Sequence, residues 1–125
     1  MLKKIMIFLI TSIVLLLGTI YYRVGHKKTE VVTYKNDIYT LTVFMIGEPE
    51  WPFGRTHCCF ELKEYTKKIT KYKFSVRNDG CFVSENNFDV NWHEEYCLLS
   101  VDGQEQAIVE YKISYKGNVL ENKEV

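Results

Sequence analysis

The chain has 125 residues, room for one folded domain, and its sixteen basic and sixteen acidic residues give a formal net charge of zero. All sixteen acids lie after residue 29, so residues 30–125 hold eleven bases against sixteen acids, a net charge of −5. This excess of acids disfavours nucleic acid as a partner and opposes approach to anionic lipid.

The N-terminal segment has the composition of a membrane-spanning helix. After a cationic start with Lys3 and Lys4, residues 5–20 are apolar except for two Thr, one Ser and one Gly, and the next charge is Arg23. With two interfacial tyrosines the run covers residues 5–22, about 18 residues, close to the roughly 20 needed to cross the hydrocarbon. We predict an uncleaved signal-anchor over residues 1–24, which makes a single pass through the cell membrane and contacts the lipid bilayer through residues 5–22.

Two alternatives remain open for this segment, a cleaved signal peptide and a buried core helix. Signal-peptide cleavage needs small residues at alternate positions, and only Gly18 and Thr19 are small near the end of the run. The flanking charges do not fix the orientation, because three positive groups lie on each side. We expect an extracytoplasmic C-terminal domain, since anchors this close to the N-terminus commonly present the rest of the chain outside, and a cytoplasmic domain is the alternative.

After a polar tether over residues 25–30, apolar residues alternate over short runs separated by Gly, Asn and Asp, which is typical of β-strands. These runs predict about seven strands within residues 31–125 and no helix of comparable signal. The domain should therefore be all-β, a single small antiparallel sandwich or partly open barrel. The runs are residues 38–45, 56–65, 70–77, 81–83, 88–92, 96–101 and 107–115, of which the second and third should form a hairpin.

Residues 47–54 form the most distinctive stretch. Two prolines prevent a strand there, and the neighbouring aromatic residues make a stiff loop that loses little entropy on binding. We predict a binding loop formed by Pro49, Trp51, Pro52 and Phe53. The alternative is a structural role, in which the loop folds back over the open end of the β core with Trp51 as a plug.

The four cysteines form no C-x-x-C pair, so the common zinc-ribbon and thioredoxin spacings are absent. Because adjacent strand residues point to opposite faces, Cys58 should join the core while Cys59 faces outward or toward a second layer. Cys58, Cys81 and Cys97 are possible disulfide participants if the domain is extracellular. The alternative is that these three are small buried hydrophobic residues with free thiols.

No set of residues indicates a specific reaction. His57, Cys59 and Glu61 alternate on one strand face, and His93 would have to complete a metal site from another strand, which is a weak pattern because such side chains are usually solvated. No serine lies in a nucleophile elbow, and no Gly-rich loop precedes a helix. We predict no catalytic residues, no metal site, no cofactor and no enzyme activity; a metal-dependent hydrolase would require His57, Glu61 and His93 to converge in a cleft.

Four features carry a resemblance to a known group of proteins: the Lys-Lys-apolar anchor, the strand at residues 37–44, the loop at residues 47–54 and the run at residues 87–92. With these the chain resembles uncharacterised small membrane-anchored proteins of Gram-positive bacteria over nearly its whole length. Those proteins typically read Ser-Pro-Asp-Gly-Lys-Tyr-Thr before the first strong strand, whereas residues 34–40 here lack the proline and the glycine. The resemblance implies an anchor and a β domain, and it assigns no site residue.

These observations favour a noncatalytic, membrane-tethered binding or interaction module at the cell surface, which holds an unidentified protein or envelope component. The alternative is an accessory, inhibitor or immunity-type protein that acts on a membrane-associated partner through the helix together with the domain. The two hypotheses differ in whether the aromatic loop or a polar stripe of the helix makes the contact.

Overall fold

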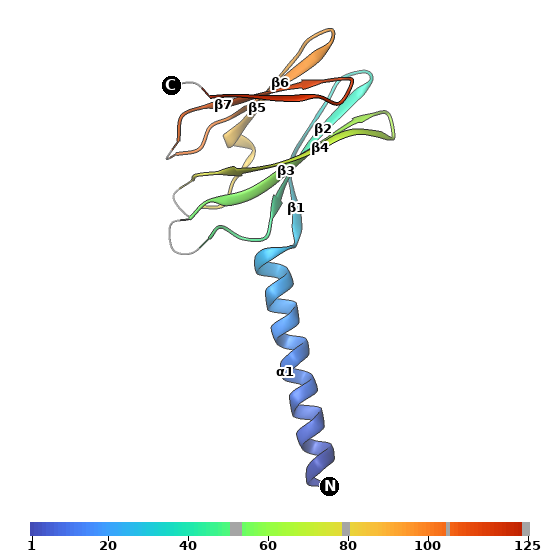
Figure 1. The fold of residues 1–125 in the computed structure, drawn as a ribbon, viewed down its shortest axis with the longest axis vertical. Coiled ribbons are helices and arrows are strands. Elements are labelled where there is room, and N and C mark those ends of the chain that lie inside the picture. Colours follow the sequence, from blue (N-terminus) through green and yellow to red (C-terminus); the bar gives the residue numbers. More distant parts are fainter. Residues whose placement is uncertain (51–53, 79–80, 105, 124–125) are drawn as a thin grey trace.

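In the computed structural model, described for residues 1–50, 54–78, 81–104 and 106–123, one N-terminal helix precedes two four-stranded antiparallel sheets (Figure 1). Helix α1 spans Leu2–Gly25. Sheet A contains, in spatial order, β1 (Lys28–Lys35), β2 (Tyr39–Ile46), β3 (Thr56–Glu64) and β4 (Lys67–Val76). Sheet B contains β5 (Phe88–Trp92), β6 (Tyr96–Val101), β7 (Val109–Ser114) and β8 (Val119–Lys123).

The predicted all-β architecture after one helix is confirmed, with eight strands rather than about seven. Strands β1 and β8 were missed because their sequences mix charged residues into short apolar runs. Residues 81–83 form no strand; the chain there leads into a short 3₁₀ turn at Glu85–Asn87. The expected hairpin between the second and third runs is present as β3 and β4, joined at Tyr65 and Thr66.

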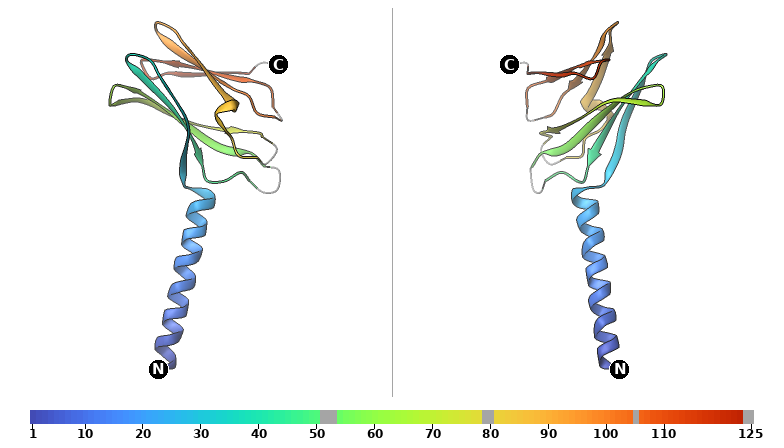
Figure 2. Two further views of the ribbon diagram at one scale, coloured as in Figure 1. Left: turned by 180° about the vertical axis from the view of Figure 1, so that it is seen from behind. Right: turned by 45° about the vertical axis from the view of Figure 1, so that its right-hand side comes forward.

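Each sheet is a simple meander, because strands that follow one another in the chain pair with one another. The two meanders pack face to face, and sheet A is the layer nearer to α1 in every view, with sheet B beyond it (Figure 2). Alternation along each strand sends one set of side chains into the shared core. The core residues are Leu41, Val43, Met45, Cys58, Phe60, Leu62, Phe74 and Val76 from sheet A, and Val83, Phe88, Cys97, Leu99, Val101, Val109, Tyr111 and Ile113 from sheet B and the segment before it.

Aromatic side chains join the two sheets at the centre of the core. Phe60 of β3 is fully buried, and its ring centroid lies 5.5 Å from Tyr72, 5.9 Å from Phe74 and 5.8 Å from Tyr111 of sheet B. At one end of the sandwich Tyr39 stacks on Tyr115 with centroids 3.9 Å apart. Aromatic pairs in this distance range add to the free energy of apolar burial.

Hydrogen bonds of amide side chains fix the crossover, the segment that leads from β4 of sheet A to β5 of sheet B. The Asn87 side chain donates to the carbonyl oxygen of Asp102 (2.8 Å) and to Asn78 Oδ1 (3.3 Å), and Asn78 donates to the carbonyl oxygen of Phe82 (3.3 Å). Asn78 is itself buried, so these bonds satisfy polar groups that water does not reach. The crossover is thereby tied to the turn after β6.

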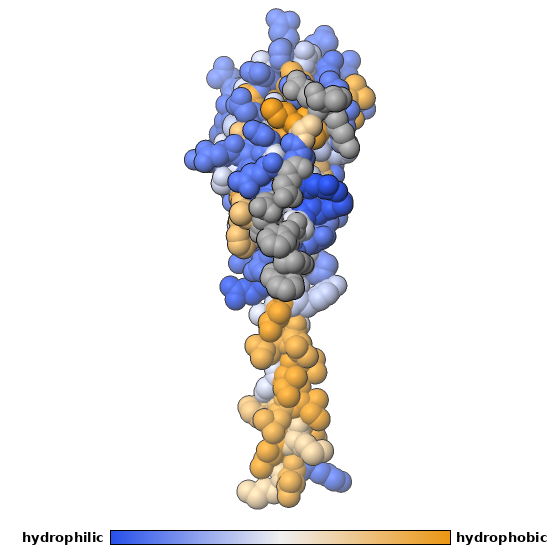
Figure 3. Space-filling view, turned by 90° about the vertical axis from the view of Figure 1, so that its left-hand side faces the viewer, coloured by the Kyte–Doolittle hydropathy of each residue, from blue (hydrophilic) through white to orange (hydrophobic). Residues whose placement is uncertain are grey.

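Helix α1 is apolar on all sides and touches no other element along most of its length, in contrast with the mostly hydrophilic domain (Figure 3). At 24 residues it is about 36 Å long at 1.5 Å per residue. The hydroxyls of Thr11, Ser12 and Thr19 donate to carbonyl oxygens one turn earlier, so these polar groups are satisfied within the helix. By length and composition the helix can cross a membrane, and a signal sequence would pass the same test.

The helix is joined to the domain by direct contact. It ends at Gly25 and β1 begins at Lys28, so only two residues of the expected tether over residues 25–30 lie outside regular elements. The amides of Gly47 and Glu48 donate to the carbonyl oxygens of Lys27 (2.7 Å) and Val24 (2.8 Å). Gly47 has a φ of 69°, and a Cβ there would lie 2.2 Å from the Val24 carbonyl oxygen, so this approach requires glycine.

Candidate functional site

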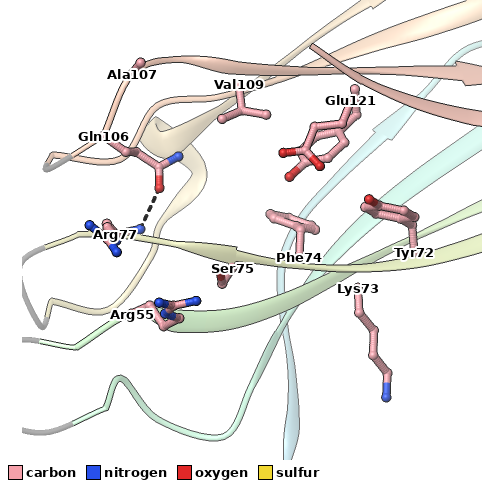
Figure 4. Close-up of a pocket in the computed structure, with 11 residues that line it drawn as sticks. Arg55, Tyr72, Lys73, Phe74, Ser75, Arg77, Gln106, Ala107, Val109 and Glu121 are labelled. Carbon is pink, nitrogen blue, oxygen red and sulfur yellow. Dashed lines mark hydrogen bonds between the residues drawn. The ribbon is translucent and has the colours of Figure 1, made fainter. Parts of the chain in front are cut away.

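A cleft opens at the side of the sandwich, between the edge strand β4 of sheet A and strands β7 and β8 of sheet B (Figure 4). Its volume is about 510 Å³, within the range of roughly 300–1,000 Å³ that is usual for ligand sites. The cleft is polar at both ends and apolar between them. It is lined by Arg55, Tyr72, Lys73, Phe74, Ser75, Arg77, Gln106, Ala107, Val109, Tyr111 and Glu121.

One end of the cleft carries two guanidinium groups, from Arg55 and Arg77. Arg55 immediately precedes β3 and Arg77 immediately follows β4, and the antiparallel pairing of Thr56 with Val76 brings the two arginines to the same end of the hairpin. The Arg77 amide donates to Gln106 Oε1 (2.8 Å), a bond that links this end of sheet A to the loop before β7 (Figure 4). The side chains of both arginines remain exposed, so this end presents fixed positive charge.

The other end of the cleft carries hydroxyl groups and a carboxyl group. Tyr111 is 4% exposed, and Glu121 of β8 lies close enough for its charge to act on the Tyr111 hydroxyl. Burial raises the pKa of Tyr111 well above the ordinary tyrosine value, and the charge of Glu121 raises it further. The Tyr111 hydroxyl therefore stays protonated and acts as a hydrogen-bond donor at neutral pH. Between the two ends the lining of the cleft is apolar, with Phe74 contributed by β4 and Val109 by β7.

Strand β4 is the last strand of sheet A, and no other described strand pairs with its outer edge. An edge strand leaves alternate amide and carbonyl groups free to pair with a further extended chain. Here the free edge runs along the mouth of the cleft, because five of the residues that line the cleft, within residues 72–77, belong to β4 or come directly after it. The site thus combines a strand edge with a charged groove.

The predicted binding loop is only partly described. Trp51, Pro52 and Phe53 lie outside the described residues, so neither the binding role nor the plug role is tested. Pro49 is partly buried, next to the Gly47 and Glu48 amides that contact the end of α1. The described part of the loop therefore lies where the domain meets the helix.

All four cysteines are free thiols in this structure. Cys58 and Cys97 are buried in the core, as expected for small hydrophobic residues, and Cys81 is exposed on the crossover. Burial raises the pKa of the Cys58 and Cys97 thiols to about 12, so both are poor nucleophiles in the folded state. Cys59 lies on the outer face of sheet A, opposite to Cys58, yet it is fully buried.

The structure does not bring together the residues that a metal-dependent hydrolase would need. His57 lies on the outer face of β3 and its Nε2 is 2.7 Å from Glu50 Oε1, whereas Glu61 is surrounded by lysines. His93 belongs to sheet B, where its ring stacks on Tyr96 with centroids 4.5 Å apart. Within the described part of the chain, no group of three or more His, Cys, Asp or Glu side chains is arranged to hold a metal ion.

Sequence reasoning missed the cleft residues, although one signal for them was present. Once residues 56–65 and 70–77 are paired as a hairpin with its turn near residue 65, Arg55 and Arg77 must lie opposite each other. Nothing in the sequence indicates that Gln106, from the loop before β7, or Glu121, from β8, would line the same cleft, because that depends on how the two meanders pack.

The chain matches no family model, no curated protein and no solved structure. The resemblance to membrane-anchored proteins of Gram-positive bacteria therefore stays a prediction. Any function has to be argued from the geometry of the chain itself.

Proposed function

We propose that the protein is a noncatalytic binding module, tethered by α1 to the membrane at the cell surface, and that its cleft holds an extended acidic segment of a partner protein. The observation that carries this proposal is the position of Arg55 and Arg77 at one end of a cleft whose mouth is the free edge of β4. The strand edge offers backbone hydrogen bonds to any extended chain, and the arginines select for acidic side chains.

The chemistry of the cleft supports binding rather than catalysis. Arginine stays protonated at all physiological pH values and cannot act as a base. The Tyr111 hydroxyl, with its raised pKa, is a weak acid and a poor nucleophile at neutral pH. Among the described residues that line the cleft, Glu121 is the one that carries a carboxyl group, and these residues do not form the carboxyl pair that paired acid–base catalysis uses.

The peptide specificity can be tested on the full chain in lipid nanodiscs with a short fluorescent peptide of alternating Asp and Val, measured by fluorescence anisotropy. We expect saturable binding, and the double substitution Arg55→Glu and Arg77→Glu should weaken it at least about tenfold, since each arginine–carboxylate bond contributes more than about 1 kcal/mol. The matched control is Lys112→Glu with Lys116→Glu, which makes the same change in net charge on sheet B and should leave binding unchanged.

The proposal also predicts sensitivity to the peptide backbone. If the peptide pairs with β4, methylation of its alternate amide nitrogens on the bonded side should abolish binding, whereas methylation of the other set should not. Equal binding of a Lys-Val peptide, or full binding to the arginine variant, would reject the acidic-segment proposal.

Orientation is tested through Cys81, the exposed thiol among four. On intact cells, a membrane-impermeant maleimide should label the native protein at Cys81 if the domain is extracytoplasmic. A Cys81→Ser variant should take up no label, because the other three thiols are buried. Labelling of the wild type only after cell lysis would place the domain in the cytoplasm and exclude the surface function.

A further inference from the structure

The two halves of the domain carry net charges of opposite sign. Residues 26–77, which form sheet A and the junction with α1, hold ten basic and six acidic residues, a net charge of +4. Residues 78–125, which form the crossover and sheet B, hold three basic and ten acidic residues, a net charge of −7. The overall excess of acids therefore hides a cationic half, and that half is the one nearer to α1 (Figures 1 and 2).

The positive charge of sheet A is gathered on its outer face, which points away from sheet B. Strand register assigns each side chain to a face, because positions that pair with outward residues also point outward. Two acids, Glu30 and Glu61, lie on this face against six lysines. We call it the lysine face: Lys28, Lys35, Lys63, Lys68, Lys71 and Lys73. In Figure 4, Lys73 projects from β4 away from the cleft.

Glu61 lies at the centre of the lysine face and forms ion pairs with two of its lysines. Its Oε1 lies 3.3 Å from Lys28 Nζ and 3.5 Å from Lys68 Nζ, and its side chain is only 11% exposed. Burial alone would raise the pKa of Glu61, but the hydrogen bonds and charges of Lys28 and Lys68 outweigh burial and lower it. One carboxylate thus holds two ammonium groups in place, and the face keeps an excess of positive charge.

Two more lysines, Lys71 and Lys73, are exposed on this face beside Glu61 and Cys59. The proximity of Lys28 lowers the pKa of Lys71, as expected where neighbouring ammonium groups repel each other. An anion bound over this region would relieve the repulsion. The face is therefore complementary to a surface with spaced negative charges.

The junction with α1 holds the lysine face on the helix side of the domain. A backbone hydrogen bond from Glu48, just after β2, to the carbonyl oxygen of Val24 joins the domain to α1, and a second one from Gly47 to Lys27 holds the two-residue link between α1 and β1. Transmembrane helices tilt by about 20° on average. Because the domain is fixed to the helix end, a tilt toward sheet A lowers the lysine face onto the membrane surface.

From these observations we infer that the lysine face rests on the anionic phospholipid headgroups of the membrane that α1 crosses, with the acidic sheet B directed away from it. Each lysine near an anionic surface favours the docked state about fivefold, the equivalent of about 1 kcal/mol. This docking is independent of any ligand in the cleft, since it uses the opposite face of sheet A.

The test uses the full chain with Cys81→Ser as background, carrying a dye at Ser75→Cys on the lysine face or at Asn91→Cys on sheet B. The protein is placed in vesicles of phosphatidylcholine alone or with about a third phosphatidylglycerol, and quenching by a nitroxide attached to lipid headgroups is measured. We expect stronger quenching at position 75 when phosphatidylglycerol is present, reversed at high salt because screening weakens exposed charges. Quenching at position 91 should not depend on the lipid.

Two charge variants separate a specific face from a general charge effect. Lys71→Glu with Lys73→Glu should remove the dependence on phosphatidylglycerol and shift the docked population by about 25-fold or more. Lys112→Glu with Lys116→Glu changes the net charge equally but lies on sheet B, and it should retain the dependence. Circular dichroism will confirm that both variants are folded. Equal quenching at position 75 in both lipids, or equal loss in both variants, would overturn the inference.

Discussion

Sheets A and B share one core but differ in strand length and in the cover of their outer faces. The strands of sheet A have 8 to 10 residues and those of sheet B have 5 or 6. On the outer face of sheet A, Cys59 and Glu61 are buried although no other described helix or strand lies above them. Phe44 pairs with Cys59, and Lys28 reaches both the Phe44 ring and Glu61. On the outer face of sheet B, Leu120 remains 65% exposed.

This difference shows that long charged side chains can serve as a covering layer. Lys28 reaches across sheet A to Glu61, and its ammonium lies 5.2 Å from the centre of the Phe44 ring. The lysines thus bury apolar surface with their stems and keep charge at the outside. The comparison can be tested by weakening the contact between the sheets, by timing their opening and by removing single charges from each outer face.

The largest effect is expected at the contact between the sheets. Phe60→Ala removes the fully buried ring that meets Tyr111 of sheet B and two aromatic residues of β4, and it should lower the free energy of unfolding by about 3–5 kcal/mol. Thermal unfolding of the full chain in detergent, followed by circular dichroism, measures this loss. The control Leu120→Ala, on the exposed face of sheet B, should change stability by less than about 0.5 kcal/mol.

The relative stability of the sheets is accessible through their thiols. Cys58 of sheet A and Cys97 of sheet B are both fully buried and both have a pKa raised to about 12, so their labelling rates under native conditions report local opening. Because sheet B has shorter strands, we expect Cys97 to react about tenfold faster than Cys58, with Cys81 faster than either. Tandem mass spectrometry of timed labelling distinguishes the sites. Earlier labelling of Cys58 would make sheet A the weaker layer.

A smaller effect is expected from the carboxylate at the centre of the lysine face. Glu61→Gln should cost about 1 kcal/mol near pH 7, which is about 4–8 °C in Tm for a domain of this size. The folded-state pKa of Glu61 is lowered, so its contribution is present above the unfolded value of about 4.3 and is lost as the pH falls through the folded pKa. Tm values of wild type and variant should therefore begin to converge as the pH falls below about 4 and should meet once the pH lies below the folded-state pKa of Glu61. If the difference in Tm between wild type and variant stayed constant down to low pH, the charge of the Glu61 carboxylate would not be the source of its contribution to stability.

Much of this fold can be predicted from local sequence patterns. The all-β class, the N-terminal helix and the β3–β4 hairpin were predicted from alternation and turn residues, which act over a few positions. Strand β1 was missed because Lys28 and Glu30 look like a polar tether until their partners on β2 and β3 are known. The burial of Glu61 and Cys59 on an outer face could not be predicted for the same reason.

The candidate site was much less predictable than the fold. A hairpin register places Arg55 opposite Arg77, but the rest of the cleft depends on which strands of the second meander face the edge of the first. That choice is made by packing of Phe60, Phe74 and Tyr111, residues that alternation assigns to the core without assigning partners. The opposite net charges of residues 26–77 and 78–125 can be counted in the sequence, but only the structure shows that the cationic half forms sheet A, the layer nearer to α1.

The smallest change in stability is expected when the lysine of a cation–aromatic contact is replaced, and each sheet has one such contact. Lys112 lies 4.3 Å from the centre of the Tyr96 ring on sheet B and Lys28 lies 5.2 Å from that of Phe44 on sheet A. Lys112→Met keeps the stem and should cost only about 0.5–1 kcal/mol, the contribution of an exposed cation–π contact. Lys28→Met should cost more, because it also removes a partner of the buried Glu61 carboxylate. Equal losses in urea unfolding of the two variants would show that Glu61 is held by Lys68 alone, and that sheet A needs no lysine from β1 to cover its outer face.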